Sequence, residues 1–408
     1  MTEENKNVKK FPNLRFPGFE GDWKTVKLGD ITSWSSGGTP SKENPSFWNG
    51  EIPWISASSM RGLVYSDSEL KITEAGLLKG SKLAKKGSLL ILVRGSMLFN
   101  KIPIGIVSKN VAFNQDVKSI VVNEQSSSEY ILYWFLAFEP TILNIVSGTG
   151  IGAGKLDLKD LKDLDVNIPN LIEQKKISAF LSLIESRIET QRKIIEKLET
   201  LMKESREKIF LRKIKFKDDN FSKWEEKKLG DILIESNEKS IKNNQYRVIS
   251  STAKGLFYQD DYFTRDIASQ DNTGYKILKK EQLVFSPQNL WLGNINVNID
   301  FEIGLVSPSY KIFNFNTSLT SYSYCNFFLK TSLMLFEYAQ SSIQGASVVR
   351  RNLDLNMFFN IRILLPSIKE QAKITSFLSS IQKKIDIEKQ ILEKLELQKK
   401  FLLANLFV

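Results

Sequence analysis

The feature that most constrains the fold of this chain is an internal repeat. Residues 23–31, with the sequence WKTVKLGDI, return roughly 200 residues later as 224–232, with the sequence WEEKKLGDI. A solenoid is excluded, because its repeating units run about 20 to 50 residues. The repeat therefore predicts two copies of a whole domain.

A second repeated segment follows each domain copy. Its shared residues are Pro169, Glu173, Gln174, Ile177, Phe180, Leu181, Ile184 and Ile188, which return as Pro366, Glu370, Gln371, Ile374, Phe377, Leu378, Ile381 and Ile385. Between the repeated segments the two halves share little. The sequence thus contains two copies of a unit made of a domain and a helix, and the sequences of the two domains differ.

Both helical segments carry apolar residues at an average spacing of about 3.5 residues, which is the a/d seam of a coiled coil. The seam positions are Ile177, Leu181, Ile184, Ile188, Gln191, Ile195 and Leu198 in the first segment, and Ile374, Leu378, Ile381, Ile385, Glu388, Leu392 and Leu395 in the second. Since the second domain begins where the first helix ends, the second helix must run back. We expect an antiparallel coiled coil with pseudo-two-fold symmetry.

Gln191 and Glu388 are equivalent polar interruptions of the two seams. In an antiparallel pair they would approach each other and fix the register, because polar seam residues commonly specify alignment. The alternative is that both are solvated at a loosened seam. A basic run at the end of the first helix suits either the helix dipole or a phosphate backbone alongside it; its members are Arg206, Lys208, Arg212, Lys213, Lys215 and Lys217.

The segments between the repeated ones mix short β-rich runs with helical patterns. The runs are residues 89–93, 117–122 and 164–168 in the first segment, and 282–285, 295–299, 310–313 and 361–365 in the second. Strands and helices alternate irregularly, which predicts α/β domains with mixed sheets. We expect an N-terminal tail, a first α/β domain, a helical spacer, a second α/β domain and a second helical spacer, over residues 1–20, 21–168, 169–217, 218–365 and 366–408.

The composition narrows the function. The chain has no histidine and a single cysteine, Cys325. Hydrolase and metalloenzyme functions are therefore disfavoured, because Ser-His-Asp triads, two-His metal sites and Cys-rich zinc clusters need these residues. The net charge of +11 indicates a polyanionic partner, although a Lys-rich proteome gives the same excess.

Nothing in the sequence predicts a membrane protein. The N-terminus is polar and does not read as a secretory signal. The most apolar stretch, residues 130–146, is interrupted by Glu139 and Pro140 and falls short of the roughly 20 residues of a membrane span. We expect that stretch to be a buried domain helix and the protein to be cytoplasmic.

Three motifs of the first domain resemble the target-recognition domains of Type I restriction-modification specificity subunits. They are residues 37–41 (GGTPS), 52–56 (IPWIS) and 114–116 (NQD). The repeated helices resemble that family's central and C-terminal regions, so the resemblance covers nearly the whole chain. The second domain lacks the first two motifs and has SPSY at 307–310 instead of NQD, which predicts a different DNA half-site.

The resemblance implies a noncatalytic DNA-recognition subunit of an adenine-specific methyltransferase and restriction complex. Each domain would read one half of a bipartite, asymmetric site in double-stranded DNA, and the coiled coil would set the gap between the halves. The coil would also dock two modification (methyltransferase) subunits, joined by two restriction (translocase/endonuclease) subunits. No cofactor is implied for this chain; the partners would use S-adenosylmethionine, and ATP with Mg²⁺ for restriction.

Candidate DNA-binding residues lie in loops around these motifs. Direct readout uses Arg or Lys for guanine and Asn or Gln for adenine. The candidates are Lys42, Ser56, Ser58, Ser59, Arg61, Arg94, Ser96, Asn114, Gln115 and Lys155 in the first domain, and Ser250, Ser251, Lys254, Arg265, Gln288, Asn289, Asn294, Arg350 and Arg351 in the second.

Two segments imitate catalytic motifs. Residues 148–155 (GTGIGAGK) lack the first Gly and the final Ser or Thr of a phosphate-binding loop, so we interpret them as a flexible approach to DNA or a connector. Asp67 with Glu69 and Lys71 imitates part of a nuclease metal site. The rival functions are a coiled-coil scaffold that never reads DNA and a self-sufficient nuclease or methyltransferase.

Overall fold

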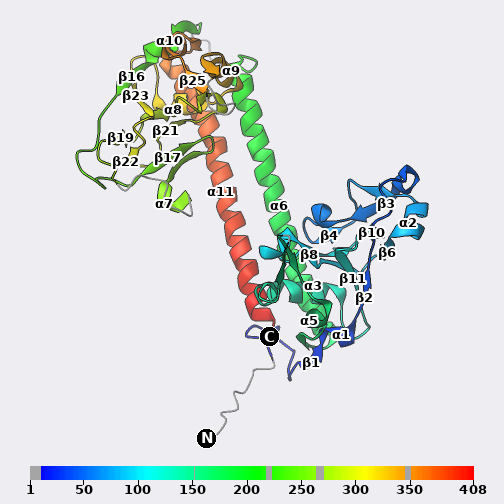
Figure 1. The fold of residues 1–408 in the computed structure, drawn as a ribbon. Helices are drawn as coiled ribbons and strands as arrows, with labels where there is room; N and C mark the ends of the chain where they lie inside the picture. The colour runs from blue at the N-terminus through cyan, green and yellow to red at the C-terminus, as the bar shows by residue number, and fades with distance from the viewer. Residues whose placement is uncertain (1–10, 151, 217–222, 263–270, 345–350) are drawn as a thin grey trace. The chain divides into compact units, whose positions relative to one another are not determined.

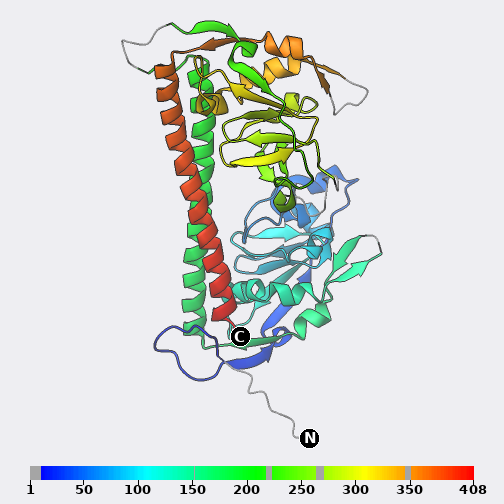
Figure 2. The same ribbon diagram turned by 90° about the vertical axis from the view of Figure 1, so that its left-hand side faces the viewer.

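The computed structural model describes residues 11–150, 152–216, 223–262, 271–344 and 351–408. They form two compact units, the first made of Met1–Arg192 with Gln390–Val408 and the second of Lys193–Lys389. Figures 1 and 2 show that each unit combines a mixed α/β domain with one segment of each of two long helices. The predicted fold class is confirmed, and each predicted β-rich run contains a strand.

The first unit is built on a five-stranded and a four-stranded sheet. The five-stranded sheet has the order β2 (Thr32–Ser36), β11 (Val117–Val122), β7 (Leu89–Leu92), β9 (Ile104–Val107) and β4 (Val64–Tyr65). The four-stranded sheet has the order β5 (Lys71–Ile72), β3 (Trp48–Ile55), β10 (Val111–Phe113) and β6 (Lys82–Ala84). The unit also contains the short helices α1 (Leu28–Ile31), α2 (Glu74–Gly80) and α5 (Leu158–Lys162).

The most apolar stretch of the chain forms two helices rather than the single one predicted. They are α3 (Ser128–Ala137) and α4 (Glu139–Leu143), which begins with Pro140 in its first turn. Proline is tolerated there and cannot continue the preceding helix. Helix α3 packs on β9 and β11, which accounts for its burial. No helix in the described part of the chain is long and apolar enough to cross a membrane.

The second unit repeats this plan with different sheets. Its four-stranded sheet has the order β16 (Leu233–Ser236), β23 (Lys311–Phe315), β20 (Leu283–Phe285) and β21 (Ile295–Val297). Three antiparallel pairs stand beside it: β17 (Ile249–Thr252) with β18 (Gly255–Tyr258), β19 (Lys276–Lys279) with β22 (Ile303–Val306), and β24 (Ser342–Gln344) with β25 (Arg351–Leu353). Its helices are α7 (Gln259–Tyr262), α8 (Tyr322–Phe328), α9 (Ser332–Gln340) and α10 (Leu355–Phe359).

The repeated segment at 23–31 and 224–232 joins the two ends of each domain. Its first copy contains β1 (Lys24–Lys27), which pairs antiparallel with β14 (Asp165–Ile168), the last strand before the long helix. In the second unit β15 (Glu225–Lys228) pairs in the same way with β26 (Arg362–Leu365). The first strand of each domain is thereby tied to its last.

A buried glutamine fixes the start of each long helix on its domain. The amide nitrogen of Gln174, which is fully buried, donates to the carbonyl oxygens of Gln125 and Pro169, and its amide oxygen accepts from the Ser127 nitrogen. Gln371 makes equivalent bonds in the second unit. A buried amide that satisfies both its donor and acceptor groups specifies one arrangement, which explains why this residue repeats.

The two long helices are α6 (Leu171–Phe210), of 40 residues, and α11 (Ile368–Leu406), of 39 residues. In the first unit, Glu185 forms an ion pair with Lys399, and Arg192 forms one with Glu396. The two helices therefore run in opposite directions. In the second unit Lys389 lies 2.6 Å from Glu199. The predicted antiparallel direction is confirmed inside the first unit.

The predicted seam residues are largely buried. Most of the apolar ones are at most 9% exposed, whereas Leu198 and Leu392 are half-buried. Of the two polar positions, Gln191 is 8% exposed and Glu388 is half-buried. The seam therefore carries polar side chains where apolar ones would fit.

Replacing Gln191 and Glu388 together by leucine is expected to raise the melting temperature by a few degrees, because apolar side chains stabilise a seam more than polar ones do. Thermal unfolding followed by circular dichroism measures the change. The control pair is Thr190→Leu with Gln390→Leu, since both residues are exposed on the same helices. An unchanged melting temperature in the seam variant would contradict a register-fixing role.

Candidate nucleic-acid interface

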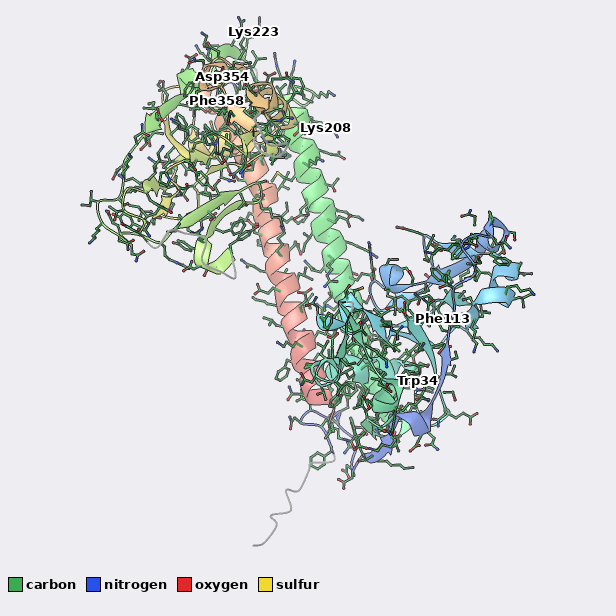
Figure 3. All side chains as sticks on the ribbon, in the orientation of Figure 1. Trp34, Phe113, Lys208, Lys223, Asp354 and Phe358 are labelled. Atoms are coloured by element: carbon green, nitrogen blue, oxygen red, sulfur yellow. The ribbon has the colours of Figure 1, made fainter. Side chains whose placement is uncertain are left out.

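The three family-like motifs of the first domain meet at the end of β10, although they lie far apart in the sequence. The Gly38 nitrogen donates to the Phe113 carbonyl oxygen at 3.0 Å, and Trp54 Nε1 donates to the Gly38 carbonyl oxygen at 3.0 Å. The Asn114 nitrogen donates to the Ile55 carbonyl oxygen at 3.0 Å. Figure 3 labels Phe113, where these backbone contacts converge.

Close backbone packing explains the paired glycines of the first motif. A Cβ atom on Gly37 would lie 2.1 Å from the Phe113 carbonyl oxygen, and one on Gly38 would lie 2.4 Å from the Gly80 carbonyl oxygen. Both distances are far below van der Waals contact. The Gly-Gly pair is therefore a packing requirement that holds neighbouring loops together.

Within the third motif, adjacent residues have different roles. Asn114 is 7% exposed, and its Oδ1 accepts from the backbone nitrogens of Asp116 and Val117 at 3.1 Å each, which holds the turn. Gln115 is exposed, and its Oε1 accepts from Thr39 Oγ1 at 2.6 Å. The geometry presents Gln115 at the surface and uses Asn114 to position it.

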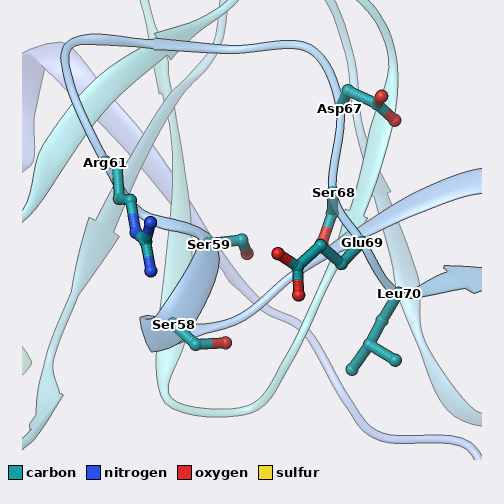
Figure 4. A pocket seen from close by; sticks show the side chains of 7 residues that line it. All are labelled: Ser58, Ser59, Arg61, Asp67, Ser68, Glu69 and Leu70. Carbon is teal, nitrogen blue, oxygen red and sulfur yellow. The ribbon is translucent and has the colours of Figure 1, made fainter. Parts of the chain in front are cut away.

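Ser58, Ser59 and Arg61 come together in a pocket of about 520 Å³. In Figure 4 the Glu69 carboxylate points towards Ser59 and Arg61, whereas the Asp67 carboxylate points away from them. Ser59 Oγ accepts from the Ser56 nitrogen at 2.9 Å, so the serines of this short turn hold one another. Lys42 is exposed in another loop and does not line this pocket.

Asp67, on the acidic side of this pocket, is engaged in contacts within the protein. Asp67 forms an ion pair with Lys71 at 3.4 Å. The pKa of Asp67 is lowered, first by a hydrogen bond from the Ser68 backbone and then by Lys71. Among the residues that the structure describes, no group of three or more His, Cys, Asp or Glu could hold a metal ion.

Residues 148–150 and 152–155, for which we predicted a flexible approach to DNA or a connector, lie largely in paired strands rather than in a plain connector. They contribute to β12 (Ser147–Thr149) and β13 (Ala153–Lys155), which pair as antiparallel strands. Strand β13 also pairs with β8 (Arg94–Gly95), with Lys155 directly opposite Arg94. The small side chains of the glycine-rich segment allow this close pairing, as Gly154 packs on Leu98. Ser96 is exposed immediately after β8.

In the second unit, Ser250, Ser251, Gln288 and Asn289 line a common pocket of about 340 Å³. Ser251 is buried and its Oγ donates to Asn294 Oδ1 at 2.6 Å, which places Asn294 beneath this surface. Ser251 and Asn294 therefore support the pocket from the interior of the domain.

Two basic candidates flank this region. Lys254 is exposed between β17 and β18. The Arg351 guanidinium carbon lies 4.3 Å from the centre of the Trp291 ring, a cation–π contact that orients the side chain. The backbone nitrogen of Arg351 also donates to the Gln288 carbonyl oxygen at 3.4 Å. The remaining candidates, Arg265 and Arg350, lie outside the described residues.

Sequence reasoning missed Lys330, which supports this pocket from below. Its Nζ donates to Asn296 Oδ1 at 2.8 Å, and Asn296 Nδ2 donates to Ser251 Oγ at 2.8 Å. Burial lowers the pKa of Lys330 to about 8, and the positive charge of Arg206 adds to the shift. The only signal in the sequence is a single lysine after the apolar residues 327–329, which is too common to identify such a residue.

Replacing Gly37 by alanine is expected to destabilise the protein by about 2–4 kcal/mol, because the new Cβ must displace the Phe113 backbone. Chemical denaturation measures the free energy of unfolding. Gly148→Ala is the matched control, since a Cβ atom there would meet nothing within 4 Å. Equal stability of the two variants would contradict the packing role of Gly37.

The free energy of unfolding is expected to rise by about 1 kcal/mol between pH 8 and pH 9.5, allowing for partial exposure of Lys330. The unfolded state binds more protons there, because Lys330 has a pKa near 8 when folded and 10.5 as an ordinary lysine. Lys330→Met should lose this increment, measured by denaturation at each pH. Lys242→Met, at an exposed lysine, should keep it; identical pH profiles for both variants would refute the assignment.

Comparison with known proteins agrees with these motifs. The family model described as "Type I restriction modification DNA specificity domain" matches residues 20–200 and 221–397. The EcoR124I/EcoR124II specificity subunit of Escherichia coli is 35% identical over 183 residues, covering 44% of this chain and 45% of that protein. This chain thus spans less than half of that relative's length.

Other relatives match more of the chain. The MjaIX specificity subunit of Methanocaldococcus jannaschii is 29% identical over 306 residues, covering 68% of this chain and 69% of that protein. The fold is similar to the crystal structure of a Type I restriction-modification system S subunit from M. genitalium, with a TM-score of 0.56 and 19% identity over 98% of this chain and 99% of that one. Since the family model matches both halves, the chain belongs to the Type I restriction modification DNA specificity domain family.

Proposed function

We propose that this protein is the noncatalytic, sequence-specific DNA-binding subunit of a Type I restriction-modification complex. The observation that carries the proposal is that one DNA specificity domain matches each half of the chain. Each domain reads one half of a bipartite site in double-stranded DNA. The recognition domains are residues 21–168 and 218–365, preceded by a tail over 1–20, and the helical spacers are 169–217 and 366–408.

The two half-sites differ in sequence, because the two domains offer different side chains. The first presents exposed Gln115 with Arg94 and Lys155 nearby, whereas the second offers a pocket lined by Gln288 and Asn289. Amide side chains suit adenine, and they stand beside basic residues in the first domain but line a pocket in the second. Two unlike surfaces favour an asymmetric target.

The coiled coil serves as a spacer. At 1.5 Å per residue, helices of 40 and 39 residues are each about 60 Å long. Half-sites read from one side of DNA lie about 34 Å apart or a multiple of it. A helical pair of this length is adequate for such a spacing and supports a target with an unread gap.

The partners are two modification subunits, which methylate adenine with S-adenosylmethionine, and two restriction subunits, which use ATP with Mg²⁺. This chain binds no cofactor of its own and works in the cytoplasm. One similar solved structure, with a TM-score of 0.55 and 14% identity, comes from a study of complex assembly in the type I restriction-modification system. Docking of the modification subunits on the coiled coil follows from the family resemblance.

Two rival functions are distinguished by simple measurements. A scaffold that only joins proteins would bind DNA weakly, whereas a DNA reader loses affinity steeply as salt rises, through counterion release. A self-sufficient methyltransferase would transfer methyl groups without a partner.

Co-expression with the modification subunit, followed by mapping of methylated adenines across a genome, is expected to reveal a split motif. Exchanging residues 21–165 for the corresponding segment of another family member should change one half of that motif, because that segment contains only the first domain. The control is the same exchange of the second domain, which should change the other half. A change in both halves from one exchange would refute the modular arrangement.

A further inference from the structure

Three basic side chains gather beside the family-like motifs, and each comes from a different strand. Arg94 in β8 lies directly opposite Lys155 in β13. Lys118 in β11 pairs with Ile91, three residues before Arg94, and burial, followed by the Arg94 guanidinium, lowers the pKa of Lys118. Strands β8 and β13 belong to one sheet and β11 to another, so the fold rather than the local sequence assembles this cluster.

The cluster is held in place by neighbouring polar groups. Lys118 Nζ donates to the Gln115 carbonyl oxygen at 2.6 Å, which orients its ammonium group beside the exposed Gln115 side chain. Lys155 Nζ lies 3.5 Å from Asp157 Oδ2. The Asp157 carboxylate already accepts from the Lys159 nitrogen at 2.9 Å as a helix cap, so its partnership with Lys155 is shared.

The arrangement has an electrostatic cost in the free protein. Like charges directly opposite on neighbouring strands are destabilising. Within the described part of the chain, Arg94 forms no ion pair, and the nearby acids Asp116 and Asp157 offset the charges of Lys118 and Lys155 only in part. An anion bound between the three cations would relieve this repulsion.

We propose that Arg94, Lys118 and Lys155 form a clamp for phosphates of the DNA backbone. This inference rests on the proposed function and assigns the three residues to positioning rather than to base readout. Phosphate contacts fix the register of a protein on the duplex and carry no sequence information. A register fixed here brings Gln115, whose amide is held by Thr39, against the base edges.

The test measures DNA affinity of the complex with its modification subunits over a range of salt concentrations, using a duplex that carries the mapped methylation motif and an unrelated duplex. The variants are Arg94→Gln, Lys118→Gln and Lys155→Gln. Each is expected to reduce the slope of log affinity against log salt by about 0.9 and to weaken binding to both duplexes roughly 3- to 10-fold. The methylated motif should stay unchanged.

Lys24→Gln is the matched control, because Lys24 is an exposed lysine of the same unit on β1, outside this cluster. Its slope should equal that of the wild type. Thermal unfolding provides a second readout: Arg94→Gln should melt at the same or a higher temperature, since a repulsion is removed, which separates weakened binding from lost folding.

Variants that keep the wild-type slope would overturn the clamp while leaving the proposed function intact. A changed half of the methylated motif would also overturn it, because the residues would then be reading bases. A wild-type complex whose binding does not depend on salt would instead overturn the proposed function, and with it this inference.

Discussion

The antiparallel pairing of the first strand of each domain with its last is the interaction on which the structure depends. Strand β1 with β14, and β15 with β26, bring residues about 140 positions apart into register immediately before a long helix begins. The buried amides of Gln174 and Gln371 then bond the first turns of those helices to their own domains. The start of each long helix is therefore bonded to the α/β domain of its own unit.

Sequence periodicity was sufficient for the helical part of the fold. The 3.5-residue spacing is a local signal that extends over many turns, so α6 and α11 were predicted closely. Short apolar runs such as 89–93 were also recognised as strands, because five apolar residues between Gly87 and Gly95 are too few for a typical helix. The family-like motifs located the region where Gln115, Arg94 and Lys155 lie.

The parts that sequence could not predict depend on partners distant in the chain. Strand β13, at the end of the glycine-rich segment, forms because β8, about 60 residues earlier, lies beside it. Asn114 is buried because the turn that it holds requires its side-chain oxygen, although its residue type suits adenine equally well. Lys118 and Lys330 carry no local signal, since each gains its role only from side chains assembled by the sheets and helices.

The division of the chain into units has a consequence for its biosynthesis. Leu395, Leu402, Leu406 and Phe407 belong to the hydrophobic core of the first unit, and the Phe407 ring lies 5.3 Å from that of Tyr130. These residues leave the ribosome only after the entire second domain. Part of the apolar surface of the N-terminal domain consequently stays uncovered until these C-terminal residues have been synthesised. Its core is completed last, unlike that of domains that fold in order of synthesis.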